Sequence, residues 1–423
     1  MVLLAIGSTA LGLALLGLAA FDVWATVLYP GFESPLSNRF HRAGWRLISV
    51  MARHTPFGAR LQGAALPLLV AGLISLWIML IFLGFAALYV PWLDVAGAFN
   101  IAQGATRQWS DALYLSGTAI ATLGFGDITP AAWPVRALLV IEGMSGMATI
   151  SLAIAYVLAV YPTLARLRVS VTALEAEVAG RANGLPLLRR YLHEDGRWDG
   201  DLDDRLRTLA LELLSLTENH ETHPVLYYNH PPRVQQSILR MLVTTQHLIG
   251  FLRYGLSPEH HANLVKNPQV LLLEQSFAFS LRRLAASLHT ATHRAADEPM
   301  DKSRYAADFA RLCGDLERLG LTSARQLDAE PVPVLAQGTR YPDLPGEGAE
   351  RVPFEAQHGL DVHPGGTDPA LDRTSESPVG AYTAFRMATD PYLVAYAATS
   401  AYSLDEAQSD AGSVWEIADE RLP

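Results

Sequence analysis

Residues 121–130, ATLGFGDITP, hold the residue types from which a backbone can build a set of ligands. Gly124 and Gly126 stand two positions apart, and glycine adopts positive φ without the steric cost that other residues meet. A backbone that changes handedness at every second residue turns successive carbonyl oxygens toward one side. Such oxygens, ringed around an axis, replace the hydration shell of a monovalent cation. The spacing therefore predicts a stretch that coordinates a cation through its main chain.

One chain supplies a single stretch of this kind, so a closed ring needs several copies, as cyclic symmetry provides. Four copies would stack rings of oxygens along a common axis. The side-chain oxygen of Thr122 would add a ring at one end, and the Asp127 carboxylate would place negative charge at the other. The residues that we predict to bind the ion are Thr122, Leu123, Gly124, Phe125, Gly126 and Asp127.

Three long apolar runs must position this stretch. Half of the 423 residues are hydrophobic and only 17% are charged, which is low for a soluble protein. A helix of about 20 apolar residues crosses a bilayer, so the runs predict three spans, near 3–28, 66–90 and 134–161. We expect the first to be a retained helix and not a cleaved signal peptide, because no basic residue precedes its long apolar run.

The segment before the glycines, Trp109 to Ala121, is apolar but too short to cross. The spans on either side both have their linked ends on one side of the membrane, so this segment must dip in and return. Non-helical backbone is tolerated at that depth only where protein covers it or it lines a water-filled cavity. We therefore predict a short re-entrant helix whose C-terminal carbonyls favour a cation below it.

Basic residues set the orientation. Between the first two spans lie Arg39, Arg42, Arg46, Arg53 and Arg60, and after the third lie Arg166, Arg168, Arg181, Arg189 and Arg190, whereas only Arg107 and Arg136 lie between the second and third. Cytoplasmic loops carry the excess of arginine and lysine. We therefore expect a multi-pass protein of the cell inner (plasma) membrane, with its N-terminus outside, residues 30–65 and the C-terminal region in the cytoplasm, and membrane lipids as partners.

TLGFGD, residues 122–127, resembles the potassium channel pore, where the sequence is usually Thr-Val-Gly-Tyr-Gly-Asp. The resemblance to the bacterial potassium channel family covers residues 66–161: an outer helix, a pore helix in LYLSGTAIAT, the selectivity filter and an inner helix. It implies passive, potassium-selective conduction through a homotetramer, with K⁺ as the permeant ion and no organic cofactor. Phe125 lacks the hydroxyl of the usual tyrosine, so a weakly selective cation channel stays an alternative, as does a non-conducting signalling or scaffold protein with a vestigial pore loop.

The resemblance also suggests roles around the filter. Gly146 matches an inner-helix glycine that relatives use as a gating hinge, with close helix packing as the equal alternative. Met147, Ile150 and Ile154 are expected to line an apolar lower cavity. Thr118 stands where some relatives carry a glutamate buried behind the filter, and we expect it to support the filter.

Two acids fall within the spans and need partners at that depth. Helical spacing puts Glu142 on a face with Ser145 and Thr149, turned away from the cavity. We expect it to be protonated or hydrogen-bonded toward the pore helix, supporting the filter, with a proton-sensitive gate as the alternative. Asp22 in the first span is expected to pair with an arginine of the adjacent loop. That loop, with apolar residues near helical spacing, is either an amphipathic helix at the inner membrane surface or a solvated loop.

The predicted fold is an all-α membrane protein with an α-helical cytoplasmic domain. Its parts are an N-terminal transmembrane helix at 1–29, a basic loop or interfacial helix at 30–65, a pore domain at 66–161, a helical domain at 162–323 and an acidic, Pro- and Gly-rich tail at 324–423. The inner helix is expected to continue to Glu177, and four amphipathic helices to follow at Leu202–Glu218, Arg233–Tyr254, Asn267–Arg294 and Arg304–Leu319. The tail should be mostly disordered, with a short docking helix near 390–407.

Other function classes find little support. The formal charge is −10, and the tail alone holds 17 acidic against 6 basic residues, so no basic patch indicates nucleic-acid binding. A single cysteine, Cys313, excludes a cysteine-rich metal site. His289 and His293 have a spacing compatible with zinc, but few acids and no cysteines accompany them. We find no catalytic grouping of side chains, and we expect neither an enzyme nor a metal centre beyond the permeant K⁺.

Overall fold

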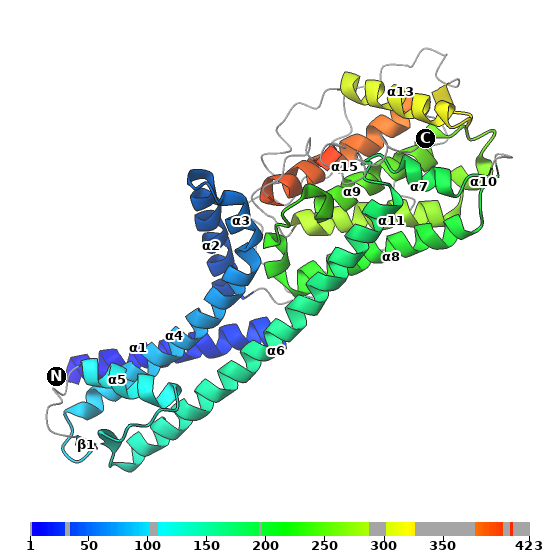
Figure 1. Ribbon diagram of the computed structural model, residues 1–423. Coiled ribbons are helices and arrows are strands. Elements are labelled where there is room, and N and C mark those ends of the chain that lie inside the picture. The colour runs from blue at the N-terminus through cyan, green and yellow to red at the C-terminus, as the bar shows by residue number, and fades with distance from the viewer. Residues whose placement is uncertain are drawn as a thin grey trace.

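The computed structural model describes residues 2–29, 34–101, 109–193, 197–286, 302–325, 377–400 and 407–408. Three of its helices are long and apolar enough to cross a membrane, over Leu3–Leu28, Ala65–Leu93 and Trp133–Glu177. They confirm the three predicted spans and the all-α class. In Figure 1 the N-terminus lies at the same end of the bundle as strand β1, and the helices that follow the third span gather at the opposite end.

The first span is α1 (Val2–Val23), continued by a π-helical turn over Trp24–Leu28. It packs along α4 (Ala65–Leu93), which also contacts the short helix α5 (Trp109–Ile120) and the third span, α6 (Trp133–Glu177). This places α4 at the centre of the bundle, where its Trp77 and Tyr89 side chains are fully buried.

Helix α6 runs through the whole molecule (Figure 1). Its 45 residues span roughly 68 Å at about 1.5 Å per residue, about twice the thickness of a bilayer's apolar core. The expected continuation to Glu177 is therefore confirmed. One helix joins the membrane part directly to the helices beyond it.

Helix α5 is the predicted re-entrant helix, and a small sheet closes the loop around it. Strand β2 (Ile128–Pro130), just after the filter, pairs antiparallel with β1 (Phe99–Ile101), which precedes α5. The carbonyl of Ala98 accepts bonds from Ala131 N (2.8 Å) and Ala132 N (3.1 Å). The sequence analysis did not predict these strands, because three-residue segments carry too little pattern to detect.

The loop between the first two spans is helical. It forms α2 (Pro35–His54) and the short helix α3 (Gly58–Gly63). This favours the amphipathic-helix alternative over a solvated loop. Its position at a membrane surface stays a prediction.

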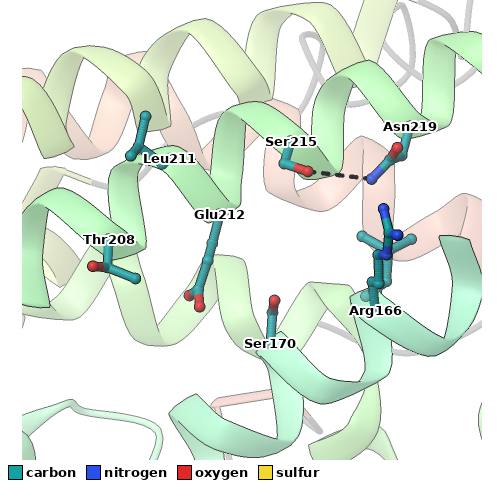
Figure 2. A pocket seen from close by; sticks show the side chains of 8 residues that line it. Arg166, Ser170, Thr208, Leu211, Glu212, Ser215 and Asn219 are labelled. Carbon is teal, nitrogen blue, oxygen red and sulfur yellow. Dashed lines mark hydrogen bonds between the residues drawn. The ribbon is translucent and has the colours of Figure 1, made fainter.

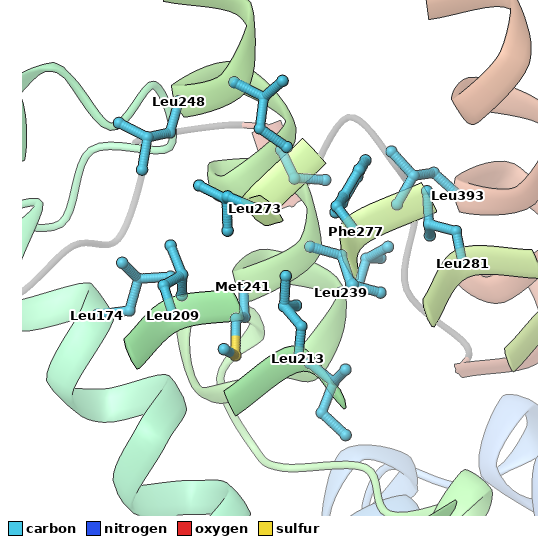
Figure 3. Close-up of a cluster of buried hydrophobic side chains, with 14 of the residues drawn as sticks. Leu174, Leu209, Leu213, Leu239, Met241, Leu248, Leu273, Phe277, Leu281 and Leu393 are labelled. Atoms are coloured by element: carbon cyan, nitrogen blue, oxygen red, sulfur yellow. The ribbon is translucent and has the colours of Figure 1, made fainter. Parts of the chain in front are cut away.

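Helices occur in all four regions where they were expected after the spans, but the one expected over Arg233–Tyr254 is divided into three segments, and residues 287–294 of the third lie outside the described part. Those that the structure describes in this region are α7 (Leu185–Arg190), α8 (Asp201–Thr222), η2 (Pro224–Tyr228), η3 (Val234–Gln236), α9 (Ile238–Ile249), η4 (Gly250–Gly255), α10 (Ala262–Val265), α11 (Pro268–Ala286) and α13 (Lys302–Arg318). Figure 3 shows their shared core, in which Leu209 and Leu213 of α8 meet Leu239 of α9 and Phe277 of α11.

The tail is more ordered than expected at one place. Helix α15 (Pro378–Ser400) begins well before the predicted docking helix and buries Tyr382, Phe385 and Arg386 in the helical part that follows the third span. Arg386 Nε is paired with Asp390 Oδ1 at 2.9 Å, and Gln246 of α9 donates to the same carboxylate at 2.7 Å. The prediction of a mostly disordered tail is wrong for this stretch, because buried aromatic and charge-paired contacts compensate for the cost of ordering it. The neighbouring tail residues lie outside the described part.

Candidate functional site

The filter backbone alternates its handedness. Positive φ occurs at Thr122 (56°), Gly124 (55°) and Gly126 (82°), with the residues between them in ordinary conformations. The glycines behave as expected. The alternation begins one step earlier, at Thr122, where a β-branched residue takes a strained conformation that glycine adopts without cost.

The amides of this stretch face the pore helix. Leu123 N donates to the Thr118 carbonyl at 2.8 Å, Gly124 N reaches the same oxygen at 3.4 Å, and Thr122 N donates to Ala119 O at 3.0 Å. In a trans peptide the carbonyl points opposite to the following amide. The carbonyls of Thr122 and Leu123 therefore point away from α5. Among the described residues, no backbone amide donates to a carbonyl of 122–126.

The outer side of the stretch is open in one subunit. Leu123 and Phe125 are 59% and 66% exposed, and a Cβ placed on Gly124 or Gly126 would meet no atom within 4 Å. Buried oxygens that face no donor are rare, but these are open to solvent or to another copy of the chain. The carbonyls are thus free to act as ligands.

The Phe125 ring is held without its missing hydroxyl. It stacks on Tyr114 of α5, with centroids 6.4 Å apart and planes 11° from parallel. The Tyr114 hydroxyl forms a hydrogen bond with the Asp127 carboxylate, which also accepts from Ile128 N at 3.1 Å. An aromatic contact and a tyrosine–aspartate bond therefore support the outer half of the filter.

Glu142 is hydrogen-bonded toward α5, as expected, and its role in supporting a filter stays a prediction. It is fully buried, and its carboxylate accepts bonds from the hydroxyls of Ser116 on α5 and, at 2.6 Å, Tyr89 on α4. The Ser116 hydroxyl also lies 2.8 Å from the carbonyl of Phe82. This carboxylate joins three helices at the level of the pore helix. Sequence reasoning named neither donor, although a serine and a tyrosine inside apolar helices were the available signal.

Thr118, Ser145 and Thr149 each use the side-chain hydroxyl within their own helix. The Thr118 hydroxyl bonds the Leu115 carbonyl of its own helix at 2.9 Å, and it is the Thr118 backbone oxygen that holds the filter. Ser145 does not join Glu142, because its hydroxyl bonds Ile141 O at 2.7 Å. Thr149 is buried on the Glu142 face, with its hydroxyl on Ser145 O at 2.8 Å.

Gly146 is packed against the end of the pore helix. A Cβ there would lie 2.9 Å from Ile120 Cγ1 and 3.2 Å from Ile120 O. Helix α6 passes through this position without a break. The geometry favours close packing over a hinge as the reason for glycine here.

The expected cavity residues form an exposed apolar strip along α6. Met147, Ile150 and Ile154 are 63%, 50% and 56% exposed, and Met144 and Leu158 continue the strip at both ends. In the single chain these side chains are left uncovered by the described residues.

Asp22 corrects one prediction. It is fully buried, and its carboxylate accepts from Ser37 Oγ (2.7 Å), Ser37 N (3.1 Å), Trp77 Nε1 (2.6 Å) and the Ser34 hydroxyl. No arginine pairs with it among the described residues. Ser34 and Ser37 begin α2, so the carboxylate sits at a helix N-terminus, where amide donors and the helix dipole favour an anion.

No group of metal-ligating side chains occurs in the described part of the chain. The proposed pair His289 and His293 lies outside it. His220 is fully buried, its Nδ1 lies 2.8 Å from Leu216 O, and burial lowers its pKa to about 4. It packs as a neutral core residue.

A hollow of about 230 Å³ lies between α6 and α8, away from the filter on the continuation of the inner helix (Figure 2). Arg166 and Ser170 line it from α6, and Glu212, Ser215 and Asn219 line it from α8. It contains none of the predicted site residues.

Comparisons with known proteins identify an ion channel domain that includes this stretch. Residues 73–161 match the family model described as ion channel. The chain is also 23% identical over 258 residues to the uncharacterized membrane protein YdjJ of Bacillus subtilis (strain 168), covering 60% of this chain and 71% of that protein. No solved structure matches the chain.

Proposed function

We propose that this chain, which carries an ion channel domain at residues 73–161, assembles as a homotetramer and conducts K⁺ passively through the filter at Thr122–Asp127. K⁺ is the permeant ion, and the proposal needs no organic cofactor and no chemical reaction. The N-terminus faces outward and the helices after α6 lie in the cytoplasm, as the arginine distribution favours.

The observation that carries the proposal is the alternation of φ at 122, 124 and 126. It accompanies a run of carbonyls that no backbone amide of the described residues bonds. A single stretch offers an ion oxygens from one side only. Four copies around an axis would surround it, which is how carbonyl rings replace a hydration shell.

The surroundings support the same arrangement. The Glu142 carboxylate braces the pore helix from behind, and the exposed strip at Met147, Ile150 and Ile154 lies on the helix that would face the axis below the filter. An apolar lower cavity of this kind can close by dewetting.

The test is a bilayer recording of the purified full-length protein under opposed potassium and sodium gradients. We expect single-channel steps and a reversal potential near the potassium equilibrium value. A reversal potential near zero would indicate the weakly selective alternative, and a silent bilayer the non-conducting one.

A matched pair of glycines sharpens that test. Gly126 and Gly320 have nearly equal φ, 82° and 80°, and a Cβ at either meets no atom within 4 Å. Gly126→Ala and Gly320→Ala therefore impose similar local strain. Only Gly126→Ala should abolish selective conduction. Equal loss in both variants would point to strain alone and would contradict the filter assignment.

The tetramer has its own measurement. Native mass spectrometry of the detergent-solubilised protein should give four times the chain mass of 46.0 kDa. A stable monomer under conditions that retain activity would end the proposal.

A further inference from the structure

Helix α2 presents three different sides. At about 100° per residue, Ser37, His41 and Ile48 share the side that is buried against the protein. One exposed side is apolar. The other is basic and holds Arg39, Arg42, Arg46 and Arg53.

The apolar side is a continuous strip. Leu47, Val50 and Met51 are 61%, 54% and 46% exposed, and Phe57 extends the strip past the helix end at 63%. Exposed apolar strips of this length are costly in water. An apolar strip next to a basic side is typical of a helix that lies in the plane of a membrane interface.

The protein fixes α2 at one height. Its first turn is pinned to Asp22 at the end of the first span, through the bonds of Ser37. Further along, a Cβ on Gly44 would lie 2.5 Å from Leu69 Cδ2, and one on Gly72 would lie 2.8 Å from the Phe40 ring. Leu69 and Gly72 belong to the first turns of α4. Helix α2 is thus held across the end of the second span, where the apolar core gives way to headgroups.

The basic side has no acidic partner among the residues that the structure describes. Residues 34–64 contain five arginines and no aspartate or glutamate. None of the five forms an ion pair with a described residue, and the side-chain bond of Arg42 goes to Asn38 O of its own helix at 3.3 Å. Guanidinium groups with no carboxylate nearby are suited to bidentate bonds with phosphate.

We propose that α2 is a binding site for anionic phospholipid of the inner leaflet, with phosphates on Arg39, Arg42, Arg46 and Arg53 and acyl chains along Leu47, Val50 and Met51. A lipid surface satisfies both exposed sides at once, whereas an acidic peptide would satisfy the arginines and leave the apolar strip in water. The inference rests on the proposed membrane orientation and does not depend on potassium conduction.

The test compares two double variants of the full-length protein in detergent. R42Q/R46Q removes two arginines of the basic side of α2, and R189Q/R190Q removes two exposed arginines of α7. Native mass spectrometry follows binding of short-chain phosphatidylglycerol, with short-chain phosphatidylcholine as the neutral probe. An arginine near an anionic surface contributes ~1 kcal/mol, or about fivefold. We expect R42Q/R46Q to weaken phosphatidylglycerol binding by about 25-fold and R189Q/R190Q to leave it unchanged.

Several outcomes would overturn the site. Equal loss in the two variants would assign the effect to net charge, and equal affinity for both lipids in the unaltered protein would remove the role of the phosphate charge. Displacement of the lipid by inorganic phosphate alone would show a simple anion site. Cross-links from α2 to the acidic residues of 326–376, with no lipid effect, would make the chain's own tail the occupant. Lipid binding is measured by mass spectrometry and not by ion current. A protein that failed to conduct in the bilayer recording would therefore not contradict the lipid site.

Discussion

At the scale of single residues, the proposed filter is backed by contacts that Gly146 and Glu142 make with α5. Gly146 admits the end of the pore helix, and Glu142 ties that helix to its two neighbours. Both contacts bear on the position of α5, whose Thr118 carbonyl holds the filter amides. Small changes at either position should therefore reach the ion site without touching it.

Replacing Gly146 by alanine should destabilise the pore, because the new Cβ would come within 3.2 Å of the Ile120 carbonyl. Gly143→Ala is the control, since no atom lies within 4 Å of a Cβ there, and alanine in a helix interior gains about 0.5–1 kcal/mol over glycine. Thermal unfolding in detergent should show a lower midpoint for Gly146→Ala and an equal or higher one for Gly143→Ala. A hinge role would instead reduce channel opening and leave the midpoint of Gly146→Ala unchanged.

Tyr89→Phe should weaken the filter support. It removes the 2.6 Å bond to Glu142 and leaves a buried carboxylate with one donor fewer, a loss of about 1–3 kcal/mol. Tyr161→Phe, at a 40% exposed position of α6, is the control. The free energy of unfolding should fall for the first variant only, together with shorter channel openings. Identical behaviour of the two would mean that the Tyr89 bond contributes nothing.

At the scale of elements, α2 meets the helical part that follows the third span through a cluster of aromatic and imidazole rings. The ring centroids of His41 and Tyr228 are 6.0 Å apart, those of Trp45 and Tyr228 are 5.8 Å apart, and His230 lies 6.4 Å from Trp45. His223 in turn contacts Tyr156 of α6 at 6.4 Å. The segment η2 therefore touches both the first loop and the inner helix.

This junction should loosen in acid. His41 is buried with neither ring nitrogen hydrogen-bonded in the described structure. Burial lowers its pKa to about 4, against an opposing effect of Asp22. Between pH 6.5 and 4 the unfolded chain binds a proton that the folded chain does not, so stability present above pH 6.5 is lost as the pH falls toward 4. His247, whose pKa is also lowered to about 4, acts with the same sign.

The measurement is the unfolding midpoint as a function of pH. It should fall between pH 7 and 5 in the unaltered protein, and more gently in His41→Gln, because one of the titrating groups is gone. His54→Gln, at an exposed position of the same helix, should follow the unaltered protein. A His41→Gln slope as steep as the original would remove His41 from the effect.

At the scale of the whole molecule, α6 carries both the exposed apolar strip and the attachment of the helices that follow it. Arg240 of α9 is only 1% exposed and grips the end of α6, with Nε 3.2 Å from Glu175 Oε2 and Nη2 2.5 Å from Gly180 O. Its Nη1 also bonds the Ala407 carbonyl at 2.8 Å. Movement of these helices would thus be transmitted along one continuous rod to the membrane.

Arg240→Gln should uncouple this attachment. Removing one member of a buried ion pair costs about 3 kcal/mol, toward the low end of the usual range because Glu175 keeps 14% exposure. We expect a lower unfolding midpoint and a changed open probability, with the reversal potential unaltered because the filter is intact. Arg311→Gln, at a 76% exposed side chain, should change neither. A shifted reversal potential in Arg240→Gln would contradict this division of roles.

Much of the architecture was readable from local properties of the sequence. The length of an apolar run fixes whether a helix can cross the membrane, and the positions near 3–28, 66–90 and 134–161 were confirmed on that basis. Positive φ at Gly124 and Gly126 follows from the absence of a Cβ, and the direction of Glu142 follows from helical period. Each of these depends on neighbours within a few residues.

Only the tertiary structure decided which residues form hydrogen bonds across the fold. Tyr89 and Glu142 are 53 residues apart, Trp77 and Asp22 are 55 apart, and Gln246 and Asp390 are 144 apart. The neighbouring sequence could not predict that two serines and an indole, and not an arginine, would hydrogen-bond to Asp22. Nor could it predict that Gly146 would pack against Ile120. Hydrophobicity and backbone preference are properties of a segment, whereas a hydrogen bond across the fold depends on which surfaces packing brings together.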